Sequence, residues 1–261
     1  MLILYLGGIV MKKKIDLHFY GTGNAFSIRP NTSFGFETRY KNLKNAFIFE
    51  VPMSTTKQII DEGYLFDNDS INSIVICISH LHEDHAGGLS TLLAWLKYAK
   101  KIPLEDKVTV ICPNIDDMET YLDLTLHLPN KQNPVITDQY CCINSAIANV
   151  KVEIQAEDVV HCEGMNSIGF DVTVSDLTKC NQQFRFYYTG DCIEIPPHIV
   201  SQFNKRDIDI LISEISEFPI DSRNVHCSYE FFKKNFSPED IRNRIIFVHY
   251  NFDYKKALNI N

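Results

Sequence analysis

Three histidines and one aspartate crowd into the short stretch His80-Leu81-His82-Glu83-Asp84-His85. An unbroken apolar run, residues 74–78, comes directly before it and predicts a strand that is buried on both faces. Side chains two residues apart in an extended segment point the same way, so His80 and His82 can hold one ion while Asp84 and His85 reach a second. Imidazoles beside a carboxylate suit borderline divalent metals. We therefore predict a metal site at the carboxyl end of this strand; the alternative is a solvated polar turn before a helix.

Further histidines and carboxylates end or follow other predicted strands. They are His161 (strand 158–162), Asp191 (strand 184–188), Glu214 (strand 209–213) and His249 (strand 245–250). His226 stands in a loop before a short predicted helix around residues 229–234. Such residues are candidates for the same chemistry.

The HxHxDH pattern resembles the signature of the metallo-β-lactamase superfamily, a fold that hosts many hydrolases. The glycine turn Gly21-Thr22-Gly23-Asn24-Ala25 resembles the opening of its ribonuclease Z-like branch, and Tyr188-Thr189-Gly190-Asp191 resembles the element whose carboxylate bridges two ions. The resemblance implies an α/β (α+β) protein, a four-layer αβ/βα sandwich, which fits the interleaved strands and helices. One departure concerns Glu50 and Pro52, because many superfamily members carry an Asp and a Gly there.

The resemblance also implies two divalent metal ions. It assigns His80, His82 and His161 to one ion and Asp84, His85 and His249 to the other, with Asp191 between them. We expect zinc, and the ligand set also accepts manganese or iron. Two such ions, two aspartates and a bridging hydroxide leave about one unit of positive charge, which favours an anionic substrate. The ions would lower the pKa of water to roughly 7 and clamp phosphodiester oxygens, while Asp84 orients the attacking hydroxide.

A pair of segments, 213–216 around Glu214 and 225–228 around His226, resembles paired motifs of the ribonuclease Z branch. Glu214 would orient His226 as the general acid that protonates the departing oxygen. The alternative is a partly buried histidine satisfied by a nearby glutamate. Because the pair is typical of phosphodiesterases of that branch, Asp84, Glu214 and His226 are the predicted catalytic residues of a phosphodiesterase.

Two features favour a small substrate. The interval from His161 to Asp191 is too short for the protruding arm of transfer-RNA processing enzymes, and the net charge of -8 disfavours an extended nucleic-acid surface. The loop lengths and the combined motifs resemble those of compact cyclic nucleotide phosphodiesterases such as phage anti-Pycsar enzymes. The alternatives are an RNA 3′-processing nuclease of ribonuclease Z type, a thioester or lactone hydrolase on the same metal centre, and a nucleotide-binding module on a retired hydrolase scaffold.

The composition is that of a globular protein, with 261 residues of which 45% are hydrophobic. It predicts one domain over residues 11–261, and initiation at Met11 would make residues 1–10 an N-terminal extension. Lysines 12–14 follow the first apolar run, whereas a signal peptide has its charge in front. The eight cysteines show no CxxC spacing, so we expect reduced thiols in a cytoplasmic protein. We also expect no membrane contact and no organic cofactor. The resemblance implies a homodimer.

Overall fold

The computed structural model describes residues 15–40, 43–63, 70–128, 132–145, 150–177, 183–218 and 225–259. The expected extension over residues 1–10 lies outside this part of the chain. The chain divides into two compact units, an N-terminal unit (Met1–Thr22 and Pro30–Thr137) and a C-terminal unit (Gly23–Arg29 and Asp138–Asn261). Each unit has its own sheet and helices, which confirms the predicted α/β class. The prediction of one domain stays a prediction.

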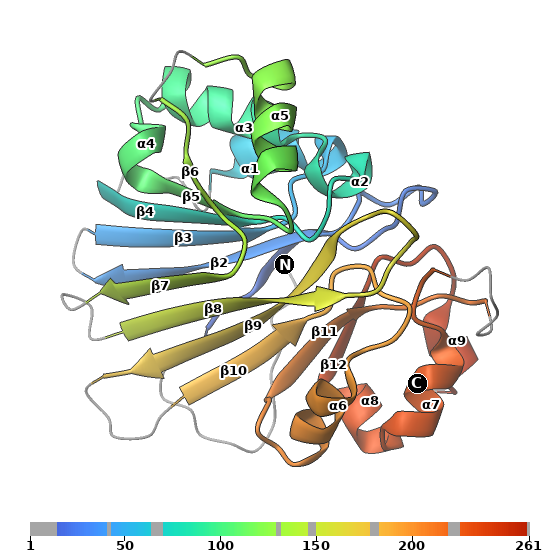
Figure 1. Cartoon of the computed structure of the whole chain (residues 1–261). Coiled ribbons are helices and arrows are strands. Elements are labelled where there is room, and N and C mark those ends of the chain that lie inside the picture. Colours follow the sequence, from blue (N-terminus) through green and yellow to red (C-terminus); the bar gives the residue numbers. More distant parts are fainter. Residues whose placement is uncertain are drawn as a thin grey trace. The chain divides into compact units, whose positions relative to one another are not determined.

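The N-terminal unit is built on a six-stranded mixed sheet in the order β1-β2-β3-β4-β5-β6 (Figure 1). Its strands are β1 (His18–Gly21), β2 (Ser33–Tyr40), β3 (Leu43–Phe49), β4 (Ser70–Cys77), β5 (Val108–Ile111) and β6 (Val135–Thr137). β1 to β3 pair antiparallel, and β3 to β6 pair parallel. Parallel neighbours need crossover connections, which here contain helices. The helices are α1 (Met53–Glu62), α2 (Glu83–Ala86), α3 (Leu89–Ala94) continued by the π-helical turn η2 (Trp95–Ala99), α4 (Leu104–Lys107) and α5 (Ile115–Thr125).

The core of this unit explains why the sequence of β4 contains an uninterrupted run of apolar residues. Ile74 and Ile76 point into a cluster with Leu89, Leu92 and other residues of the crossover helices, and all are inaccessible to solvent. The strand residues between them face the other side of the sheet and are buried as well. The prediction of a strand buried on both faces is therefore correct, and the histidine-rich stretch starts three residues after β4 ends.

The C-terminal unit repeats this plan with the strand order β12-β11-β10-β9-β8-β7. Its strands are β7 (Tyr140–Ser145), β8 (Val150–Val159), β9 (Ser167–Asp176), β10 (Gln183–Tyr188), β11 (Ile210–Glu214) and β12 (Ile245–Val248). β7 to β10 pair antiparallel, and β10 to β12 pair parallel. An apolar cluster joins β10 to β12 with the helices α6 (Pro197–Asn204), α7 (Tyr229–Asn235), α8 (Pro238–Asn243) and α9 (Tyr254–Leu258). No helix in the described part of the chain has the length and apolar character that a membrane crossing requires.

One local prediction differs from the structure. The strand predicted over residues 158–162 is part of a longer strand, because β8 extends from Val150 to Val159, and His161 lies beyond its end.

Gly88, at the start of α3, shows how tightly the histidine-rich stretch is packed. A Cβ atom at this position would lie 1.8 Å from Oγ1 of Thr56, a buried residue of α1 that donates its hydroxyl to the Pro52 carbonyl. We expect Gly88→Ala to lower the free energy of unfolding by about 1–3 kcal/mol, since overpacking forces neighbouring groups to shift. Urea unfolding measures this loss. Adding Thr56→Ala should recover part of it, and a G88A variant as stable as the wild type would contradict this account of the packing.

Candidate metal centre

The predicted histidine cluster forms at the carboxyl end of β4. Pairing continues one residue past the strand, where the Ile78 N–H donates to the Ile111 carbonyl, and α2 then begins at Glu83. Between these points the chain turns so that Nε2 of His80 and Nδ1 of His82 are 2.8 Å apart. The ring centroids of His80 and His85 are 4.1 Å apart, and both side chains are fully buried. The N-terminal unit thus brings three predicted ligands together.

Ser79 orients two of these imidazoles. Its buried hydroxyl lies 3.0 Å from Nδ1 of His80 and 3.5 Å from Nδ1 of His85. Protein groups on the Nδ1 side of a histidine fix its ring and leave Nε2 as the nitrogen that binds metal. Ser79 therefore acts through the histidines beside it, a role that the sequence pattern alone does not indicate.

Glu50 is a second residue whose role the sequence pattern alone does not indicate. Its carboxylate is fully buried, accepts the Ser79 N–H at 3.2 Å and lies 3.4 Å from Nδ1 of His85. Its backbone is left-handed at φ 59°, a conformation that costs a non-glycine residue about 1–3 kcal/mol. The sequence shows only that a glutamate directly follows an apolar strand, which does not reveal its contacts with Ser79 and His85. Glu50 therefore holds the histidine-rich loop and His85 in place through its buried carboxylate.

We expect Glu50→Gln to weaken metal binding by about 10–100-fold, because partners of ligand side chains tune both their orientation and their basicity. Competition with a chelator, followed by metal analysis, measures the change. Glu105→Gln removes an exposed carboxylate of α4 in the same unit and should leave metal binding at the wild-type level. Equal metal affinity of E50Q and the wild type would show that Glu50 has no influence on the ligands.

The C-terminal unit carries a second cluster, in which four side chains from separate segments meet. Nε2 of His249 lies 3.3 Å from Oδ2 of Asp191, and Nδ1 of His249 lies 3.6 Å from Oε2 of Glu214. With His226 these residues form a group of four, in which one nitrogen or oxygen atom from each side chain lies within 4.8 Å of those of the others. His249 follows β12 in the left-handed region at φ 54°, as Glu50 does after β3. The carboxyl ends of β10, β11 and β12 thus deliver this cluster.

Glu214 and His226 form the predicted dyad. Nδ1 of His226 lies 2.6 Å from Oε2 of Glu214. The other oxygen of Glu214 accepts the backbone N–H groups of Cys192 and Cys227, so the carboxylate is held rigidly in a buried position. Burial opposes protonation of His226, but the charge and hydrogen bond of Glu214 and the charge of Asp191 outweigh it and raise the pKa of His226 above its usual value. His226 is therefore suited to carry a proton.

His161 and Asp84 complete the predicted set. Nδ1 of His161 donates to the Val225 carbonyl at 2.9 Å, so Nε2 is the nitrogen that would bind a metal ion. The His161 ring lies 5.2 Å from that of His226. Asp84, in the first turn of α2, has Oδ2 3.7 Å from Nε2 of His85. Its side chain is 14% exposed, so it can also reach solvent.

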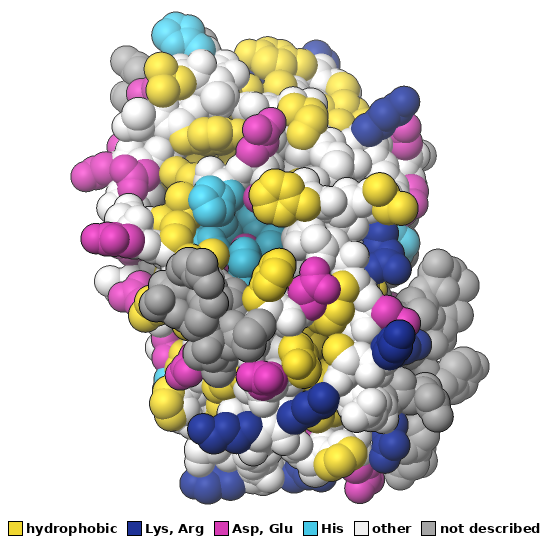
Figure 2. All heavy atoms as spheres, turned by 90° about the vertical axis from the view of Figure 1, so that its right-hand side faces the viewer, with side chains coloured by type: hydrophobic (Ala, Val, Ile, Leu, Met, Phe, Trp, Pro, Cys, Tyr) yellow, Lys and Arg dark blue, Asp and Glu magenta, His cyan; other side chains and the backbone are white. Residues whose placement is uncertain are grey.

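Both clusters fit divalent metal ions by their donor atoms. Imidazole nitrogens and carboxylate oxygens are the ligands of zinc, manganese and iron sites. In the C-terminal unit, Asp191 and Glu214 are almost completely buried in one cluster. Burying two carboxylates together is costly unless positive charge compensates them, and a cation supplies it. Figure 2 shows a group of histidine side chains that solvent can reach, bordered by hydrophobic side chains.

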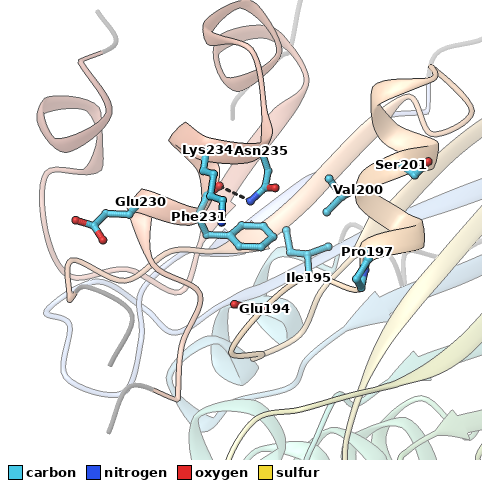
Figure 3. Close-up of a pocket in the computed structure, with 9 residues that line it drawn as sticks. All are labelled: Glu194, Ile195, Pro197, Val200, Ser201, Glu230, Phe231, Lys234 and Asn235. Atoms are coloured by element: carbon cyan, nitrogen blue, oxygen red, sulfur yellow. Dashed lines mark hydrogen bonds between the residues drawn. The ribbon is translucent and has the colours of Figure 1, made fainter. Parts of the chain in front are cut away.

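A separate cavity of about 490 Å³ lies between α6 and α7 of the C-terminal unit. Its lining combines apolar residues, of which Ile195, Val200 and Phe231 point toward one another (Figure 3), with polar residues such as Ser201 and Asn235. None of the predicted site residues line it. The cavity is therefore distinct from the predicted metal ligands and from the Glu214–His226 dyad.

Each unit has its own sheet and helices and carries a cluster of histidine and carboxylate side chains. This combination is that of a metal-dependent hydrolase with the metallo-β-lactamase fold. The family model described as Anti-Pycsar protein Apyc1 matches residues 15–259. The chain belongs to this family. The predicted superfamily and the prediction of a hydrolase enzyme of the phosphodiesterase type are confirmed.

Solved structures share the fold at low sequence identity. The human tRNase Z short form is 18% identical with a TM-score of 0.54, over 90% of this chain and 97% of that chain. A long-form RNase Z from yeast is 16% identical with a TM-score of 0.64, over 96% of this chain and 39% of that chain. Yeast PDE1 is 12% identical with a TM-score of 0.57, over 91% and 88%. A search of curated protein sequences finds no match.

Proposed function

We propose that this chain is a dinuclear metal-dependent phosphodiesterase that hydrolyses a cyclic nucleotide. The observation that carries the proposal is the 2.6 Å contact between His226 and the buried carboxylate of Glu214. A histidine held in this way is a proton donor for an oxygen leaving group. Hydrolysis of a thioester has less need of such a donor, because a thiolate leaves without being protonated.

The metal ions would be held by the seven residues predicted from the sequence. His80, His82 and His161 would hold one ion, Asp84, His85 and His249 would hold the other, and Asp191 would contribute to both. When bound, such ions lower the pKa of water and polarise phosphoryl oxygens. Zinc is the expected metal, and the homodimer implied by the family stays a prediction that light scattering tests.

The residues of the chain then divide the proton transfers between them. Asp84 accepts a hydrogen bond from the attacking water and orients it toward phosphorus. His226 gives its proton to the sugar oxygen as the bond to phosphorus breaks, and Glu214 stabilises the imidazolium before that step. Well-placed acid–base groups of this kind contribute about 10²–10⁴-fold to a rate.

Family membership and charge favour a small substrate. The family description names an anti-Pycsar protein, and the structurally similar yeast PDE1 and tRNase Z proteins carry names of phosphodiester-cleaving enzymes. The net charge of -8 disfavours an extended nucleic-acid partner. A cyclic mononucleotide offers one anionic phosphate, which matches a site with a small excess of positive charge.

A substrate panel tests the proposal. Metal-reconstituted protein is incubated with cyclic mononucleotides, cyclic dinucleotides, a transfer-RNA precursor and a thioester, and the products are separated by chromatography. We expect a linear nucleotide monophosphate from at least one cyclic mononucleotide. Cleavage of the transfer-RNA precursor alone would favour a nuclease of ribonuclease Z type, and turnover of the thioester alone would favour the carboxyl-ester alternative.

A further inference from the structure

The segment Gly23–Arg29 belongs to the C-terminal unit, although the residues on both sides of it belong to the N-terminal unit. Short local hydrogen bonds define its shape. Oδ1 of Asn24 accepts the Phe26 N–H at 3.0 Å, and Oγ of Ser27 accepts the Arg29 N–H at 3.0 Å. A Cβ atom on Gly23 would lie 2.7 Å from the Arg29 carbonyl oxygen, so the turn needs glycine there. The segment is therefore a tight turn that presents Arg29 at its end.

The Arg29 side chain lies over the ring of Tyr250, with the guanidinium carbon 4.9 Å from the ring centroid. Tyr250 directly follows the predicted ligand His249. Its ring packs edge-on against Tyr254 at 4.7 Å, and both rings pack on the apolar core of the unit. An aromatic face holds a guanidinium in a defined plane without using its N–H donors.

Other arginines of the C-terminal unit form ion pairs with carboxylates. Arg185 is paired with Asp171, and Arg206 and Arg244 are paired with Asp240. Among the residues that the structure describes, no carboxylate forms an ion pair with Arg29, and its side chain is exposed. A fixed guanidinium with unused donors next to a metal ligand matches the geometry that binds phosphate through two parallel hydrogen bonds.

We propose that Arg29 is a substrate-binding residue that holds the anionic phosphate group through charge-assisted hydrogen bonds, with Tyr250 as its platform. This inference rests on the proposed phosphodiesterase function and names a residue that binds its substrate. Arg29 acts on binding of the phosphate and leaves the proton transfers to other residues. Its loss therefore changes KM more than kcat.

The experiment compares Arg29→Gln, Arg29→Lys and Arg242→Gln in metal-loaded protein. Arg242 is an exposed residue of α8, so its replacement removes the same charge elsewhere in the unit. Hydrolysis of bis-p-nitrophenyl phosphate gives kcat and KM, and calorimetry gives the affinity for inorganic phosphate. We expect R29Q to raise KM and the dissociation constant of phosphate by about 10-fold or more, with kcat within about 3-fold of the wild type.

Arg29→Lys keeps the charge without the planar fork, so its phosphate affinity should lie between those of R29Q and the wild type. R242Q should match the wild type. If R29Q has the same KM and the same phosphate affinity as the wild type, Arg29 does not bind the phosphate group. Wild-type protein that binds two metal ions but cleaves no phosphodiester would refute the proposed function instead, and the phosphate affinities would still decide the role of Arg29.

Discussion

Asp191→Asn is expected to lower kcat/KM for phosphodiester hydrolysis by about 1000-fold or more and to reduce the metal content of the protein. Asn keeps the size of the side chain but removes the buried negative charge that the site uses to hold cations. A decrease of about 1000-fold in kcat/KM corresponds to the loss of several kcal/mol of transition-state stabilisation. Hydrolysis of bis-p-nitrophenyl phosphate, together with metal analysis of the same samples, measures both effects.

The matched control is Asp207→Asn, which removes an exposed carboxylate of the same unit and should leave rate and metal content unchanged. Circular dichroism shows whether D191N is folded. A folded D191N variant that keeps more than about a tenth of the wild-type activity would exclude Asp191 from the metal centre.

His226→Ala is expected to lower kcat by about 10²–10⁴-fold for a substrate whose leaving group is an alkoxide, such as the ribose oxygen of a cyclic nucleotide. The departing alkoxide needs a proton, which in the proposed mechanism comes from His226 held by Glu214. A p-nitrophenolate leaving group departs without protonation, so the same variant should lose much less activity on bis-p-nitrophenyl phosphate. The ratio of the two losses separates proton donation from a general effect on the metal ions.

His198→Gln is the control for this variant, because His198 is an exposed residue of α6 that pairs with Glu157. It should leave both rates unchanged. Equal losses in H226A on the two substrates would mean that His226 serves the site in another way, for example as a metal ligand.

The sequence is most informative where chemistry and strand pattern coincide. His80, His82 and His85 follow a strand that is apolar because both of its faces are buried, so the ligands and their place in the fold can be predicted together. Glu214 also ends a buried strand, β11, but its role is predicted from the resemblance of its segment to a motif of the ribonuclease Z branch.

Other features depend on contacts that no local pattern contains. β8 carries the polar residues Gln155 and Glu157 in its centre, so the predicted strand 158–162 begins only after them, whereas pairing with β7 and β9 keeps β8 continuous from Val150. The role of Glu50 arises from its hydrogen bond with the Ser79 N–H, which joins segments 29 residues apart. Arg29 contacts a tyrosine more than two hundred residues away in the sequence.

The most direct test of the central claim is a metal titration of metal-free protein, followed by its rate of cyclic mononucleotide hydrolysis at each step. Zinc, manganese and iron are titrated separately. We predict that with at least one of them the rate rises until two ions are bound per chain and that the product is a linear monophosphate. If the protein binds two ions but hydrolyses no cyclic mononucleotide, the proposed substrate class is contradicted. If the full rate is reached with one bound ion, the dinuclear site is contradicted.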